Sequence, residues 1–201
     1  MAFITPYSKK STQADGVFQA MKRILPLALL LSTLSSAVVA SDMSIEYATS
    51  TLVDEIYVMD AFIEFEFDDE VITALSHGIP ITIDIQVKVK RNREWLWDPV
   101  ARDETVSFRL ERHALSDHYL LINLQTEQKE QFQYLDEALT DLGTINQHFL
   151  FDASTIDDQA SYVGYIRARL DIESLPPPLR PMAYFSGHWR AKSDWYEWLV
   201  K

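Results

Sequence analysis

The sequence contains no cysteine and only five glycines in 201 residues. Without cysteine the chain forms no disulfide bonds, and thiolate metal sites and thiol catalysis are excluded. The few glycines leave little material for a phosphate-binding loop, and no GxSxG, HExxH or Walker-type sequence occurs. The five histidines stand singly, never at HxH or HxxxH spacing. The sequence therefore predicts no catalytic residue, no metal site and no cofactor.

Basic residues are also scarce. Lys and Arg total 18 against 30 Asp and Glu, which gives a formal net charge of −12 at pH 7. A surplus of negative charge of this size repels nucleic-acid backbones and anionic lipid surfaces. We therefore expect no nucleic acid among the partners of this protein.

Apolar runs long enough to span a bilayer are absent. The stretch from Ile24 to Val39 carries no charge and has 16 residues, whereas a membrane helix needs roughly 18 to 20. Lys22 and Arg23 precede this run and small residues end it, so residues 21–40 are predicted to be a signal peptide. We interpret residues 1–20 as a mis-assigned extension and expect a periplasmic chain from Ser41, without stable membrane insertion after cleavage. An uncleaved anchor is the alternative.

What the sequence does contain is alternation of apolar and polar residues. It is clearest at 81–90, where Ile and Val alternate with Thr, Asp, Gln and Lys, and similar patterns occupy 57–67, 105–112, 118–124 and 162–172. Short helices are expected at 69–77 and around 135–142. We predict one mainly β (α+β) domain over 41–201: an antiparallel β-sandwich with one or two short helices.

The C-terminal part has a different composition. Residues 174–181 read SLPPPLRP, and their prolines favour extended or polyproline conformation. The tail at 182–201 holds six aromatic residues: Tyr184, Phe185, Trp189, Trp195, Tyr196 and Trp198. Because disordered tails are poor in aromatic residues, we expect this tail to pack against the sheets.

One internal segment is a candidate docking surface. Trp95 and Trp97 lie on the same side of an extended chain, with Asp98 and Arg102 close in sequence. Two indoles beside a guanidinium group are typical of partner-docking patches. The alternative is that the aromatic tail covers both indoles. Arg180, in the proline segment, is a further candidate, as an anchor for the tail.

Several of these stretches together resemble a known family. They are KVKRNREWLWDPVA at 88–101, HYLLINLQTEQKEQF at 118–132, SLPPPLRP at 174–181 and HWRAKSDWYEW at 188–198. The chain from about Ile45 to Val200 resembles the uncharacterised bacterial family called domain of unknown function 4390. The resemblance implies an exported protein without an assigned activity, so it supplies no catalytic residues. Genes of this family often lie beside a membrane sensor histidine kinase, which implies a periplasmic accessory role.

Three functions are compatible with these features. The leading hypothesis is a non-enzymatic periplasmic interaction module that docks a protein partner, such as a membrane signalling receptor. The alternative is a carrier of a small apolar ligand, held between two sheets in a pocket lined by residues such as Phe65, Phe67, Tyr162 and Tyr165. A hydrolase with dispersed carboxylates ranks lowest.

Overall fold

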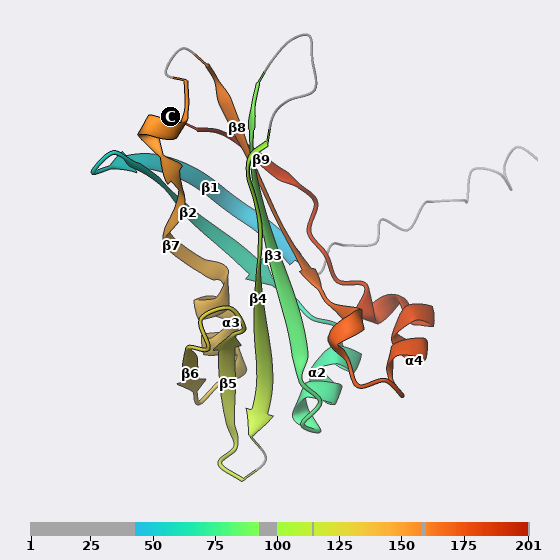
Figure 1. The fold of residues 1–201 in the computed structure, drawn as a ribbon. Coiled ribbons are helices and arrows are strands. Elements are labelled where there is room, and N and C mark those ends of the chain that lie inside the picture. Colours follow the sequence, from blue (N-terminus) through green and yellow to red (C-terminus); the bar gives the residue numbers. More distant parts are fainter. Residues whose placement is uncertain (1–42, 93–99, 114, 158–159, 201) are drawn as a thin grey trace, which may run out of the picture. The chain divides into compact units, whose positions relative to one another are not determined.

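The computed structural model describes residues 43–92, 100–113, 115–157 and 160–200. It contains two antiparallel sheets (Figure 1). The three-stranded sheet has the order β1-β2-β7, with β1 (Met43–Val53), β2 (Ile56–Phe65) and β7 (Thr144–Asp152). The six-stranded sheet has the order β6-β5-β4-β3-β8-β9: β3 (Ile81–Arg91), β4 (Val100–His113), β5 (His118–Asn123), β6 (Lys129–Phe132), β8 (Tyr162–Leu170) and β9 (Tyr196–Val200). The predicted mainly β, sandwich-like fold is confirmed.

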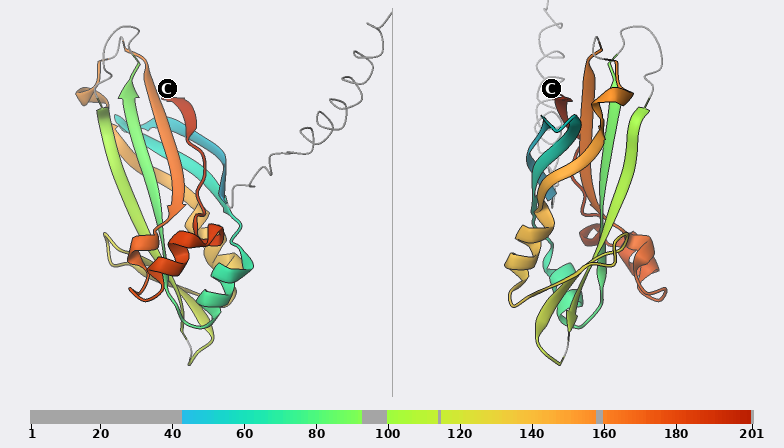
Figure 2. Two further views of the ribbon diagram at one scale, coloured as in Figure 1. Left: turned by 90° about the vertical axis from the view of Figure 1, so that its right-hand side faces the viewer. Right: turned by 60° about the vertical axis from the view of Figure 1, so that its left-hand side comes forward.

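The core lies between the two sheets, which face each other in Figure 2. The alternation at 81–90 places Ile81, Ile83, Ile85, Val87 and Val89 on the inner surface of β3, where all five are buried. This strand pairs with β4 on one side and with β8 on the other, so it lies in the middle of its sheet. Its alternating pattern is clean because one surface is covered along its whole length.

Two short helices form where the sequence predicts them. Helix α2 spans Asp69–Ser76 and begins at Asp68, whose carboxylate accepts a hydrogen bond from the Glu70 backbone N–H at 2.9 Å. Gly78 follows the helix with a φ of 81°, the left-handed conformation that favours glycine. Helix α3 spans Leu135–Gly143. No helix among the described residues is long and apolar enough to cross a membrane.

The proline segment differs from its prediction. Residues 174–181 are not extended throughout: η2 spans Ile172–Ser174, and α4 spans Arg180–Phe185. Between them the Leu179 N–H donates to the Pro176 carbonyl at 2.9 Å, which forms a turn. Leu175 is buried in the core, and its burial favours this compact path over a polyproline one.

The aromatic tail packs against the rest of the domain, as predicted. Strand β9 pairs with β8, and Trp198 is buried against the backbone of Gly164. Trp189, in η3 (Gly187–Trp189), is 2% exposed and donates from its indole nitrogen to the Glu70 carboxylate at 2.7 Å. The tail therefore fixes α2 and α4 at the same end of the sheets, as Figure 1 shows.

Candidate binding cleft

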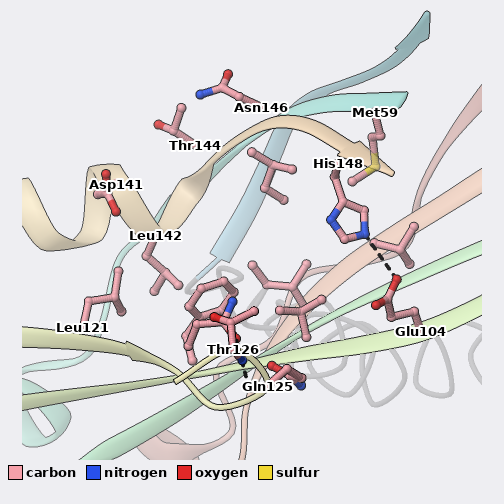
Figure 3. A pocket seen from close by; sticks show the side chains of 16 residues that line it. Met59, Glu104, Leu121, Gln125, Thr126, Asp141, Leu142, Thr144, Asn146 and His148 are labelled. Atoms are coloured by element: carbon pink, nitrogen blue, oxygen red, sulfur yellow. Dashed lines mark hydrogen bonds and ion pairs between the residues drawn. The ribbon is translucent and has the colours of Figure 1, made fainter. Parts of the chain in front are cut away.

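A cleft of about 360 Å³ lies between the two sheets. Residues of β2 and β7 form one wall, residues of β3, β4 and β5 form the other, and α3 closes one end (Figure 3). Its volume falls in the range of pockets that hold small organic ligands. None of the four aromatic residues expected to line such a pocket takes part, because Phe65, Phe67, Tyr162 and Tyr165 do not border this cleft.

The positions of these four aromatic residues explain the difference. Phe65 and Phe67 stack on each other with ring centroids 6.1 Å apart. Tyr162 packs against Phe151 at 6.1 Å and is buried. Tyr165 lies on the other side of β8, where its ring contacts Trp195. The expected pocket of these residues is therefore wrong, whereas a pocket between the sheets does occur.

The strand lengths explain why the sheets part here. Strand β5 pairs only with residues 108–113 of β4, so residues 100–107 of β4 have a strand partner on the β3 side alone within the described chain. Strand β7 pairs with β2 and forms the edge of its own sheet. Two sheet edges therefore border the cleft. At its closed end, Gly143 lets α3 approach β2, because a Cβ there would lie 2.0 Å from the Ile63 carbonyl oxygen.

Apolar side chains form the floor of the cleft. Those on strands β2 to β5 are Met59, Ile85, Val87, Val106, Phe108 and Leu121, and Leu142 and Ile145 join them from α3 and β7. Burying an apolar ligand against such a floor is favourable by about 25 cal/mol per Å² removed from water. The floor therefore suits the hydrocarbon part of a ligand.

Charged groups occupy one side of the rim. The His148 ring nitrogen Nε2 lies 3.3 Å from the Glu104 carboxylate, as the dashed line in Figure 3 marks. The Arg102 Nε donates to the same carboxylate at 3.0 Å, and its guanidinium lies 5.3 Å from the centre of the Phe149 ring. Partial burial raises the pKa of Glu104, but hydrogen bonds and charge from Arg102, aided by His148, outweigh it and leave this pKa below its usual value.

Amide side chains shape another part of the rim. The Gln125 side chain accepts from the Ser107 backbone N–H and donates to the Thr105 carbonyl, both at 3.1 Å. The Gln125 amide thus satisfies backbone groups on the open edge of β4 that a neighbouring strand would otherwise bind. Asn123 accepts from the backbone N–H groups of Gln125 and Thr126 at 3.0 and 3.1 Å, which fixes the turn after β5. These amides are committed to the protein's own backbone.

Two polar side chains of the rim remain open to a ligand. Among the described residues, neither the Asp141 carboxylate nor the Asn146 side-chain amide has a hydrogen-bond or ion-pair partner. Asp141 lies near the end of α3 and Asn146 lies on β7, and Figure 3 shows both at the border of the cleft. A ligand with an apolar body and a polar group can satisfy both parts of this lining.

Comparison with known proteins gives one match. The family model of a domain of unknown function, DUF4390, matches residues 40–199. The chain belongs to the DUF4390 family. The resemblance inferred from the sequence is thereby confirmed. Neither the curated proteins nor the solved structures contain a match to this DUF4390 protein. Because the family has no described function, the membership assigns no role to any residue of the cleft.

The predicted docking residues of this DUF4390 protein are only partly visible. Trp95, Trp97 and Asp98 lie outside the described residues. Arg102 donates to Glu104 at the rim of the cleft and lies opposite Val89, near one end of β3. Arg180 follows η2, and Asp171, just before η2, donates its N–H to the Thr82 carbonyl near the other end of β3 at 2.8 Å. Roughly 23 Å of strand separates these positions, so Arg102 and Arg180 do not form one surface.

Arg180 acts within the tail segment. Its Nε donates to the Leu175 carbonyl at 2.8 Å, and its guanidinium lies 4.0 Å from the Glu173 carboxylate. These contacts join Arg180 to Leu175 and to η2, and its role as an anchor of the tail stays a prediction. No group of three or more His, Asp or Glu residues that could hold a metal ion occurs within the part of the chain that the structure describes.

Sequence reasoning missed two interacting polar residues at the rim of the cleft, Glu104 and His148. One signal pointed to Glu104: it lies on the same side of β4 as Val106, Phe108 and Leu110, which is the inner surface of the strand. A carboxylate on the apolar side of a strand is a candidate functional residue. No such signal marked His148, because the strand that carries it was not predicted.

Proposed function

We propose that this protein is a non-enzymatic binding module that holds a small, largely apolar ligand in the cleft between its two sheets. The observation that carries the proposal is the cleft of about 360 Å³ with its apolar floor. A sandwich whose only task was stability would fill this space with side chains, because cavities in a core are destabilising. The open space therefore favours ligand binding.

The chemistry of the rim supports a ligand with one polar end. Asp141 and Asn146 present an acceptor and an amide without protein partners among the described residues. On the other side, Arg102 compensates the charge of Glu104. The ligand we propose has an apolar body that contacts the floor and a hydrogen-bond donor that reaches Asp141.

The proposed setting is the periplasm, supported by the signal-peptide pattern at 21–40. We place the docking of a protein partner, such as a membrane signalling receptor, in the same proposal. Trp95 and Trp97 lie in the segment that joins β3 to β4, and both of these strands line the cleft. The docking role of Trp95 and Trp97 stays a prediction.

A filled-cleft variant tests the proposal. Val106→Trp adds an indole to the floor, whereas Thr105→Trp adds the same indole to the exposed surface of the same strand. We expect wild-type protein and Thr105→Trp to bind Nile red, a neutral apolar dye, saturably and with equal affinity. Val106→Trp should bind it at least about tenfold more weakly, the equivalent of 1.4 kcal/mol. Equal binding by all three folded proteins would contradict the proposal.

A further inference from the structure

On the side away from the cleft, β3 and β8 of the six-stranded sheet carry four cations in a chain of net charge −12. Glu197 of β9 lies on the same surface, opposite Tyr165. Lys88 and Lys90 extend from β3 on the surface opposite its buried isoleucines and valines, and Arg167 and Arg169 do so from β8. The strand register brings Gln86 opposite Arg167 and Lys88 opposite Tyr165. We call the surface formed by Lys88, Lys90, Arg167, Arg169, Tyr165 and Trp195 the cationic face.

Aromatic rings hold these cations in place. The Arg167 guanidinium lies 4.4 Å from the centre of the Trp195 ring, and the Lys88 ammonium lies 5.6 Å from the same ring. The Lys90 ammonium lies 5.5 Å from the Tyr165 ring, which meets Trp195 edge-on at 6.5 Å. Cations over aromatic rings lose part of their conformational freedom before any partner arrives, which lowers the entropic cost of binding.

The internal carboxylates leave part of this charge uncompensated. Asp84 is nearly buried and accepts from Arg169 at 2.9 Å, and Asp103 lies 3.2 Å from Lys88. By contrast, Lys90 and Arg167 contact no carboxylate among the described residues. Of the four cations of the face, these two therefore have no ion pair within the part of the chain that the structure describes.

The guanidinium group of Arg167 is also oriented so that it can bind a carboxylate of a partner. Its Nε donates to the Gln86 side-chain oxygen at 2.6 Å, and its ring contact orients the guanidinium plane. Its two terminal nitrogens have no hydrogen-bond partner among the described residues. A guanidinium group in this state matches a carboxylate, which accepts two parallel hydrogen bonds from it.

We propose that the cationic face docks an acidic polypeptide segment of a partner protein, with carboxylates at Arg167 and Lys90 and an apolar contact at Trp195. Trp195 is 36% exposed, which leaves part of its ring for such a contact. At physiological salt, charges more than about 8 Å apart are largely screened. A short acidic segment bound at this face is therefore affected mainly by the charges of the face itself. An anionic bilayer would also face the rest of an acidic chain and be repelled by it.

The test uses a fluorescein-labelled peptide of eight glutamates and the purified full chain. We expect fluorescence anisotropy to show saturable binding in 20 mM salt that weakens as salt is raised. Lys90→Gln and Arg167→Gln should each weaken binding about two- to fivefold, the range for exposed ion pairs. Arg167→Lys, which keeps the charge but not the planar fork, should bind with intermediate affinity.

The control variant is Lys129→Gln, which removes an equal charge from the exposed strand β6. Its affinity for the peptide should equal that of the wild type. No binding by the wild type at low salt, or equal losses in all three glutamine variants, would overturn the proposal. Binding to phosphatidylglycerol vesicles through Lys90 and Arg167 without binding to the peptide would also overturn it, because the face would then be a lipid site.

This proposal is independent of the cleft. Val106→Trp should bind the acidic peptide as the wild type does, because Val106 borders the cleft between the sheets and the cationic face lies on the opposite surface of its sheet. Conversely, Arg167→Gln should leave the affinity for Nile red unchanged. The two experiments therefore fail or succeed separately.

Discussion

The imidazole of His148 lies 3.3 Å from the carboxylate of Glu104, across the gap between the two sheets. His148 belongs to the edge strand β7, and Glu104 belongs to the half of β4 that β5 does not cover. The pair thus links two strand edges that are not hydrogen-bonded partners in either sheet. Arg102 holds the carboxylate from the other side, and its contact with Phe149 adds a second link between the same two strands.

This link predicts a pH dependence. Despite the opposing effect of partial burial, Arg102 and His148 hold the pKa of Glu104 below its usual value of 4.5. A carboxylate whose pKa is lower in the folded state stabilises the fold above the unfolded-state pKa, and this contribution is lost as pH falls through the folded-state value. Glu104→Gln should therefore be less stable than wild type at pH 7, and the difference should shrink below about pH 4.5. Urea unfolding at pH 7, 5 and 3 measures it. A difference that stays constant with pH would contradict the assignment.

Because Gly164 and Trp198 are in close contact, we predict that adding one methyl group at Gly164 lowers the stability of the fold. A Cβ at Gly164 would lie 2.3 Å from atoms of the Trp198 ring, which is itself buried. Gly164→Ala should therefore destabilise the fold by about 1 to 3 kcal/mol, the usual cost of overpacking. Gly187→Ala is the matched control, because a Cβ at Gly187 meets no atom within 4 Å. Chemical denaturation of both variants tests the prediction, and equal midpoints would contradict it.

The tail supplies a third prediction. Trp189 is buried and its indole N–H donates a hydrogen bond to Glu70, whereas Phe185, four residues earlier, is 92% exposed. Trp189→Ala should cost about 3 to 5 kcal/mol, as large-to-small changes in a core do. Phe185→Ala should change stability by less than about 0.5 kcal/mol. Urea unfolding gives both values. Similar costs for the two variants would mean that the tail does not pack through Trp189.

Arg180 provides a milder test of the same segment. Its hydrogen bond to the Leu175 carbonyl and its proximity to Glu173 tie the start of α4 to η2. Arg180→Ala should lower stability by about 1 kcal/mol and speed limited proteolysis within residues 174–190. Met182→Ala, at an exposed position of the same helix, should leave the cleavage rate unchanged. Unchanged protease resistance in Arg180→Ala would show that the guanidinium is no anchor.

The sequence predicted the strands whose alternation is unbroken. Strand β3 alternates along its whole length because neighbours cover both of its edges and the other sheet covers one surface. Strands β1 and β7 were not predicted. In β1 the register shifts between Ile45 and Tyr47, which breaks the alternation. In β7 the pairing with β2 shifts twice, and Gln147 has a positive φ of 49°.

The residues that line the cleft could not be predicted from the sequence, for a different reason. Its lining comes from five strands and a helix that are distant in the chain, so it depends on register and strand length rather than on a local motif. Strand β5 has 6 residues and β4 has 14, so β5 leaves the first part of β4 without a partner on that side within the described chain. The aromatic residues proposed for the pocket are apolar enough to line one, but Phe65 and Tyr162 pack in the core instead.

The central claim is that the cleft holds a small ligand, and native mass spectrometry tests it most directly. The full-length sequence would be expressed in a bacterial host, and the protein would be analysed as isolated and after incubation with a lipid extract of the same cells. We predict an added mass of a few hundred daltons that is retained by wild-type protein and by Thr105→Trp and is lost in Val106→Trp. A wild-type protein that carries no added mass in either sample, or a filled variant that retains the same mass, would contradict the account.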